Sequence, residues 1–109
     1  MTDKLFNELW LDALGQPDRD IYIAKYGLAE WASRIGKDYS EIIKVLESIH
    51  EVAHMSVKDM ILYTGLSQAK FATRFCIPIS TVEKWCMEKQ KCRDYERLMI
   101  AKILGILEV

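Results

Sequence analysis

The sequence contains little proline, little glycine and no long apolar run, and each scarcity removes a class of structure. Two prolines and five glycines among 109 residues are too few for a loop-rich β sandwich. Charged residues interrupt every window of about 18 residues, which excludes a membrane-spanning helix. The start of the chain, MTDKLFNELW, carries an early acid and lacks the apolar stretch of a secretion signal. We therefore expect a cytoplasmic protein that does not enter a membrane.

Cysteine is also scarce, and its arrangement excludes a disulfide framework. The three cysteines, Cys76, Cys86 and Cys92, are odd in number and irregularly spaced, and none belongs to a C-x-x-C pair. This pattern predicts reduced thiols that are buried or half-buried, rather than a redox centre or a zinc site. No phosphate-binding glycine loop, Ser-His-Asp order or paired-carboxylate signature stands out, so we expect no catalytic residues and no cofactor.

The residues that are abundant favour a compact fold with two different parts. Half of the residues are hydrophobic and 28% are charged, enough to bury a real core. Residues 1–55 hold six Lys or Arg against ten Asp or Glu, whereas residues 56–109 hold nine against six. We therefore expect an acidic N-terminal region, 1–55, that dimerises or binds a protein partner, and a domain, 56–109, that meets an anionic partner.

Apolar residues recur at intervals of three and four along nearly the whole chain, which predicts an all-α protein. Asp18, Asp38 or Ser40, Ser56 and Ser67 stand where helix N-caps are expected. The expected helices cover residues 3–14, 18–35 (one helix, or two divided at Gly27), about 40–54, 57–64, a short segment after Ser67, 79–86 and about 94–104. The expected apolar positions are Leu5, Leu9, Trp10, Ala13 and Leu14 in the first helix, Ile21, Ala24, Leu28, Trp31 and Ile35 in the second, Ile42, Leu46, Ile49 and Ala53 in the third, and Leu98, Met99, Ala101 and Ile103 in the last.

The helices of the second half are short and closely spaced. Helices of about 8–10 residues are not stable alone in water, so they must pack together. Cys76-Ile77-Pro78 forms a tight turn between two of them, because proline disfavours helical geometry at Ile77. This arrangement is typical of a helix-turn-helix unit.

Three segments carry a family resemblance. Residues 64–72, TGLSQAKFA, resemble the tGLSQxxFA opening of XRE/Cro-type, lambda-repressor-like DNA-binding domains, and residues 77–85, IPISTVEKW, resemble their GIPxxTVxxW recognition segment. Tyr95 to Leu98 resembles the closing PxYxxxL helix. The resemblance covers roughly residues 57–105, under half of the chain. It implies a helix-turn-helix bundle that binds double-stranded DNA as a homodimer, in a small bacterial or phage regulator, either a repressor or an antitoxin-like protein.

The resemblance also implies which side chains meet DNA. Val82 and Trp85 anchor the recognition helix on a scaffold in which the small Ala72 allows close helix crossing, and the opposite face enters the major groove. The expected base contacts are Ile79, Ser80, Glu83 and Lys84, and the expected phosphate contacts are Ser67, Gln68, Lys70, Thr81, Lys89 and Lys91. The two copies would meet through the N-terminal helices or through the apolar residues 103–109.

Four positions depart from the family pattern. Cys76 and Glu88 stand where the family has glycine, and Cys92 stands where it has proline. Ser80 occupies a position at which relatives often carry arginine. The departure at Cys76 is conformational, because the turn glycine of the family often needs a positive φ.

Two alternatives remain open. A helix-turn-helix scaffold can act as a protein-interaction module or inhibitor instead of binding DNA. Separately, His50-Glu51-Val52-Ala53-His54 matches H-E-x-x-H, in which two histidines one helical turn apart hold zinc and the glutamate acts as general base. A zinc hydrolase needs a third ligand, which would have to be Glu83 or Glu88. We therefore expect both histidines to border the apolar stripe of their helix and to bind no metal.

Overall fold

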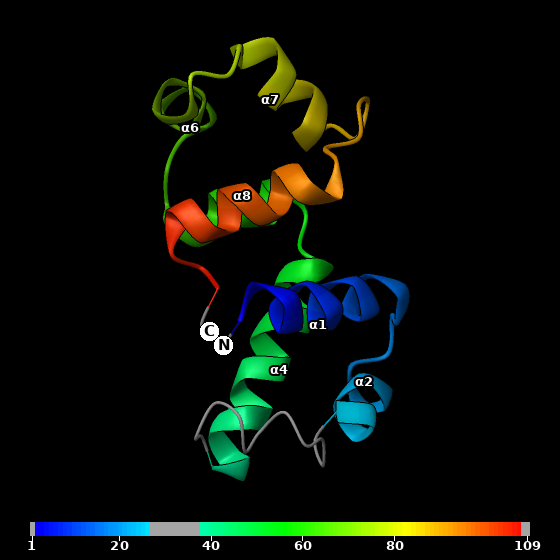
Figure 1. The fold of residues 1–109 in the computed structure, drawn as a ribbon. Helices are drawn as coiled ribbons and strands as arrows, with labels where there is room; N and C mark the ends of the chain where they lie inside the picture. The colour runs from blue at the N-terminus through cyan, green and yellow to red at the C-terminus, as the bar shows by residue number, and fades with distance from the viewer. Residues whose placement is uncertain (1, 27–37, 108–109) are drawn as a thin grey trace. The chain divides into compact units, whose positions relative to one another are not determined.

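The computed structural model describes residues 2–26 and 38–107, and all regular structure in these ranges is helical. The helices are α1 (Asp3–Gly15), α2 (Arg19–Tyr26), α4 (Tyr39–Ala53), α5 (Val57–Thr64), α6 (Gln68–Phe75), α7 (Ile79–Cys86) and α8 (Asp94–Leu104) (Figure 1). The all-α prediction is confirmed. Within these ranges no helix has the length and apolar character needed to cross a bilayer.

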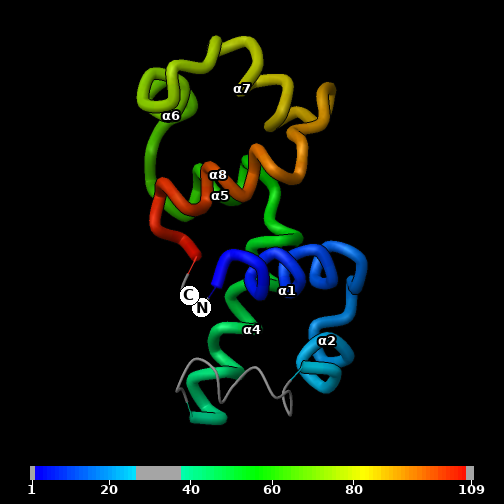
Figure 2. The backbone as a smooth tube through the Cα atoms, in the orientation of Figure 1, coloured from blue at the N-terminus to red at the C-terminus, as the bar shows by residue number. Residues whose placement is uncertain are grey.

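The helices divide between two compact units. The first holds α1, α2 and α4, and the second, Met55–Ile106, holds α5 to α8 (Figure 2). In the first unit α4 packs against both α1 and α2. Its core consists of Phe6, Leu9, Trp10, Ala13, Tyr22, Ile42, Val45, Leu46, Ile49, Val52 and Ala53.

The face of α2 that meets this core is not the expected one. Ile21, expected to be buried, is 55% exposed, whereas the neighbouring Tyr22 is only 1% exposed. The Tyr22 hydroxyl donates a hydrogen bond to the Leu9 carbonyl at 2.7 Å, so the polar end of the ring is satisfied inside the core. Ala24 is likewise exposed. The remaining expected positions of this stripe, Leu28, Trp31 and Ile35, lie outside the described residues.

The expected helix starts are confirmed by their capping contacts. The side chains of Ser56 and Ser67 accept hydrogen bonds from the backbone N–H groups of Asp59 and Lys70, both at 3.1 Å. The Asp18 and Asp38 carboxylates cap α2 and α4 in the same way. Gly65 ends α5 and Gly105 ends α8, each with φ of 72°, a left-handed conformation that glycine adopts without strain.

The second unit is built around α7. The sequence from α6 to α7 turns over residues 76–78, and Figure 1 shows α6 end-on while α7 runs across the view, so the two helices cross steeply. The core of the second unit consists of Val57, Met60, Ile61, Phe71, Ala72, Val82, Trp85, Cys92, Ile100, Ala101 and Ile106. In α8 the expected stripe is only partly correct: Ala101 is buried and Leu98 half-buried, but Met99 and Ile103 are exposed and Ile100 takes the core position.

Candidate nucleic-acid interface

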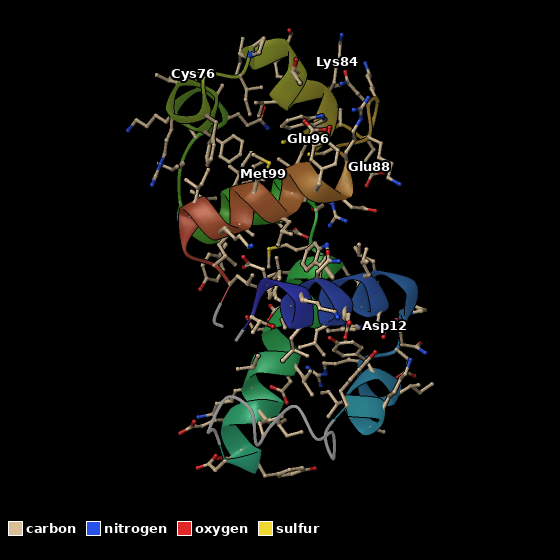
Figure 3. All side chains as sticks on the ribbon, viewed as in Figure 1. Asp12, Cys76, Lys84, Glu88, Glu96 and Met99 are labelled. Atoms are coloured by element: carbon tan, nitrogen blue, oxygen red, sulfur yellow. The ribbon has the colours of Figure 1, made fainter. Side chains whose placement is uncertain are left out.

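One face of α7 is buried and the opposite face is open. Val82 is fully buried and Trp85 nearly so, and they anchor α7 against the neighbouring helices. The four expected base-reading residues, Ile79, Ser80, Glu83 and Lys84, are all exposed. They occupy two adjacent rows of the helix surface, since residues three and four apart are neighbours on a helix. Lys84 projects outward from α7 (Figure 3).

The residues expected to contact phosphate lie at the start of α6 and in the loop that follows α7. Gln68 and Lys70 are exposed in the first turn of α6, beside the Ser67 cap. Lys89 and Lys91 are exposed in the loop after α7, where the backbone N–H of Lys89 donates to the Lys84 carbonyl at 2.9 Å. Two expected contacts are less available: the Ser67 hydroxyl oxygen already accepts the Lys70 N–H, and Thr81 is half-buried.

Arg93 is a candidate that the sequence reasoning missed. It is exposed and lines a shallow recess with Lys91, Asp94 and Tyr95, and its guanidinium donates to the Tyr95 hydroxyl at 3.0 Å. The signal was the alternation Lys89, Lys91, Arg93, which extends the basic loop by one cation. Arg97, by contrast, is half-buried and holds the fold together, because it pairs with Asp94 at 2.7 Å and donates to the Met55 carbonyl at 2.8 Å.

Charge supports an anionic partner for this unit. Residues 55–106 hold nine Lys or Arg against five Asp or Glu. Glu83 is the acidic residue among the four exposed α7 side chains, and it sits next to Lys84 in the sequence. The unit therefore carries a formal charge of +4, and Glu83 is a hydrogen-bond acceptor on the exposed face of α7.

Cys76 and Glu88 adopt the left-handed conformation. Their φ angles are 55° and 57°, and within the described ranges they are the non-glycine residues with positive φ. Cys76 ends α6, and its backbone N–H donates to the Thr73 carbonyl at 3.3 Å. Both positions therefore keep a glycine-like backbone despite carrying a side chain, at a cost of roughly 1–2 kcal/mol each.

Replacing Cys76 with glycine should therefore raise the free energy of unfolding by about 1 kcal/mol, because it relieves the left-handed strain and removes only an exposed thiol. Urea denaturation followed by circular dichroism measures this. Lys70→Gly is the matched control: Lys70 is exposed within α6, so its replacement should destabilise by about 1 kcal/mol. A loss of stability in Cys76→Gly would contradict the assigned conformation.

The two histidines of the H-E-x-x-H run have structural partners. His50 is buried and its Nε2 lies 2.7 Å from the Gln16 carbonyl oxygen, while His54 Nε2 lies 2.7 Å from that of Ala13. A carbonyl oxygen has no proton to give, so each Nε2 carries the hydrogen and donates it. These contacts go to carbonyls at the C-terminal end of α1, where the Ala13 oxygen also accepts the Gln16 backbone N–H at 3.3 Å. Both Nε2 atoms are therefore already used by the fold.

Glu83 and Glu88, the only expected sources of a third ligand, belong to the second unit, and the described residues contain no cluster of three or more metal-ligating side chains. We predict that protein purified without added metal carries less than about one zinc per ten chains, where a structural or catalytic site would approach one. Plasma emission spectrometry measures this. Stoichiometric zinc that disappears in His50→Ala would overturn the structural assignment.

The cysteines differ in exposure. Cys92 is buried and Cys86 half-buried, as expected, but Cys76 is exposed because it ends α6 at the surface. Burial raises the pKa of the Cys92 thiol to about 11, and the nearby Glu96 carboxylate adds to the shift. Burial also raises the pKa of Cys86. Both thiols stay protonated at neutral pH, which makes them poor nucleophiles and poor metal ligands.

No family model, curated protein or solved structure matches this chain.

Proposed function

We propose that this protein is a sequence-specific duplex DNA-binding protein that acts as a small transcriptional regulator. The observation that carries the proposal is the division of α7 into a buried face, held by Val82 and Trp85, and an open face with hydrogen-bonding and cationic side chains. A helix anchored in this way can enter a major groove without loss of its own packing.

Each open side chain of α7 has a complementary base edge. Lys84 can donate to the oxygen and N7 of guanine, and Ser80 can donate to or accept from several edges. Glu83 can accept from the cytosine amino group, and the Ile79 side chain can contact a thymine methyl. The combination favours a mixed rather than an A·T-only half-site.

Exposed side chains on both sides of α7, the neutral Gln68 and three lysines, fit the role of phosphate contacts. Gln68 and Lys70 precede α7, and Lys89 and Lys91 follow it, so a duplex that accepts α7 would pass both groups. The backbone N–H groups of the first turn of α6 would favour a phosphate near Gln68. Arg93 extends the second group.

The conformation of the two departing positions also favours this function. Cys76 and Glu88 hold left-handed backbone where the resembled family has glycine. The turn before α7 and the loop after it thus have the backbone conformation that a glycine at each position would adopt. An operator read by one helix per chain offers a short half-site, so we expect two copies on a two-fold symmetric operator.

Selection from random duplexes tests the proposal directly. The parent protein should enrich a palindromic site, and Lys84→Ala should bind that site about 1–3 kcal/mol more weakly while relaxing one base position. Lys44→Ala, which removes an exposed lysine of α4, is the matched control and should keep the parent's preference. If no duplex is enriched, or if Lys84→Ala selects the parent's site with parent affinity, the assignment of α7 is wrong.

A second candidate, a protein-interaction module on the same scaffold, is favoured by one observation. Ile79 and Met87, eight residues apart along α7 and its C-cap, are both exposed large apolar side chains. This candidate predicts that the selection enriches no site and that Ile79→Ser weakens capture of a protein partner.

A further inference from the structure

The recess that Arg93 lines lies where the loop after α7 joins the first turn of α8 (Figure 1). Its walls are formed by Lys91, Arg93, Asp94 and Tyr95, and its volume is about 470 Å³. Sites for small molecules commonly occupy about 300–1,000 Å³. The recess is therefore large enough for a small organic ligand, and the charges of its walls decide which kind.

Two cations of the recess can still bind a ligand. Lys91 is exposed, and no ion pair of the described residues involves it. The Arg93 guanidinium donates from one nitrogen to the Tyr95 hydroxyl at 3.0 Å. This bond holds the guanidinium in place, and a guanidinium has five N–H donors, so most of them remain for a second acceptor.

The acidic residues of the first turn of α8 already have partners. The Asp94 carboxylate accepts a hydrogen bond from the Arg97 guanidinium at 2.7 Å. Glu96, labelled in Figure 3, accepts the Arg93 backbone N–H at 3.2 Å. The N-terminal end of α8 adds its own partial positive charge. The recess therefore favours an anion over a cation.

A phosphate monoester matches these groups better than an anion of single charge. At neutral pH it carries a charge of about −1.5 to −2 and three acceptor oxygens, so it can use both cations at once. The planar guanidinium of Arg93 can bind two of the oxygens, and Lys91 can bind the third.

Tyr95 adds a surface for a ring. Its side chain is 55% exposed, and the phenol ring offers a flat apolar face on which a base can stack. We propose that the recess binds a nucleoside monophosphate, with the phosphate held by Lys91 and Arg93 and the base against Tyr95. The inference goes beyond the proposed function, because it concerns a free ligand and is tested without DNA.

Calorimetric titration of the full chain with adenosine monophosphate tests the site. The parent should bind one equivalent saturably, and Arg93→Ala should raise the dissociation constant at least about tenfold, because it removes charge-assisted hydrogen bonds. Arg74→Ala is the matched control, since Arg74 is an exposed arginine of α6 outside the recess, and it should bind like the parent. Unchanged thermal melts establish that both variants fold.

Three further probes separate the contributions of the phosphate and the ring. Adenosine lacks the phosphate, and inorganic phosphate lacks the ring. Cyclic adenosine monophosphate keeps both but is a diester of single charge, like a DNA phosphate. Each probe should bind the parent at least about tenfold more weakly than adenosine monophosphate, because each lacks part of the proposed contacts.

Absence of saturable binding of adenosine monophosphate up to about 10 mM would overturn the inference. An equal loss of affinity in Arg93→Ala and Arg74→Ala would show that net charge, rather than the recess, attracts the ligand. A cyclic diester or inorganic phosphate that binds as tightly as the monoester would refute the assigned ligand class. None of these outcomes depends on the DNA selection, so failure of the proposed function and failure of this inference are distinguishable.

Discussion

Replacing Trp85 with alanine is expected to lower the free energy of unfolding by about 3–5 kcal/mol. Trp85 is only 9% exposed and, with Val82, holds α7 on its scaffold. Because a domain of this size has about 5–15 kcal/mol of stability in total, the loss is a large fraction of it. Urea denaturation followed by helical circular dichroism measures the effect. A midpoint like the parent's would mean that Trp85 does not anchor α7.

Trp85→Phe separates the contribution of the aromatic ring to stability from that of the indole N–H. The Trp85 indole Nε1 is buried and has no hydrogen-bond partner among the described residues. An unpaired buried donor costs about 1–3 kcal/mol, so phenylalanine removes that penalty while it leaves a smaller cavity than alanine. We expect Trp85→Phe to destabilise far less than Trp85→Ala. Equal losses would show that the indole N–H has a partner such as a buried water.

Removing three lysines together should weaken binding to every duplex by roughly 100-fold at about 0.15 M salt. The variant replaces Lys70, Lys89 and Lys91 with alanine, and all three are exposed beside α6 and α7. Each phosphate contact releases counterions, so the slope of log affinity against log salt should fall by about 3. Fluorescence anisotropy titrations at several salt concentrations measure both quantities.

The control is a triple variant with the same change in net charge. Lys4, Lys25 and Lys44 lie in the first unit, and Lys25 is 3.6 Å from Asp12 in a surface ion pair that contributes little stability. Their replacement with alanine should leave the salt slope nearly unchanged. If the two triple variants lose affinity equally, long-range charge rather than phosphate contact governs binding, and the assigned phosphate contacts are wrong.

Local features of the chain were predictable because their physics is local. Ser56, Ser67 and Asp38 cap helices by bonding backbone N–H groups three residues away, which needs no distant partner. Gly65 and Gly105 end helices for an equally local reason, their access to positive φ. The buried pair Val82 and Trp85 was expected from the family resemblance, and their spacing of three in α7 agrees with it.

Predictions failed where two faces of a helix were similarly apolar. In α2, Ile21 and Tyr22 both suit a core, and the choice went to Tyr22 because the Leu9 carbonyl of α1 accepts its hydroxyl. In α8, Met99 and Ile103 are as apolar as Ile100, but only Ile100 of the three is buried where α8 packs in the second unit. The spacing of residues within one helix could not predict which of them is buried, because the contacts that decide it are made by another helix.

The sequence by itself determined the all-α class and the helix ends, because caps, turns and short apolar spacings act within a few residues. The residues that face outward from α7 were expected from the family resemblance. Only the tertiary structure decided the role of His50 and His54. Their spacing on α4 placed both rings on one side of the helix, as a zinc site needs, but what they meet there is the end of α1. The carbonyls of Ala13 and Gln16 lie more than thirty residues away in the chain. The spacing of two residues along a helix specifies which side of the helix their side chains occupy. It does not specify which residues of another helix they contact, because that depends on how the helices pack.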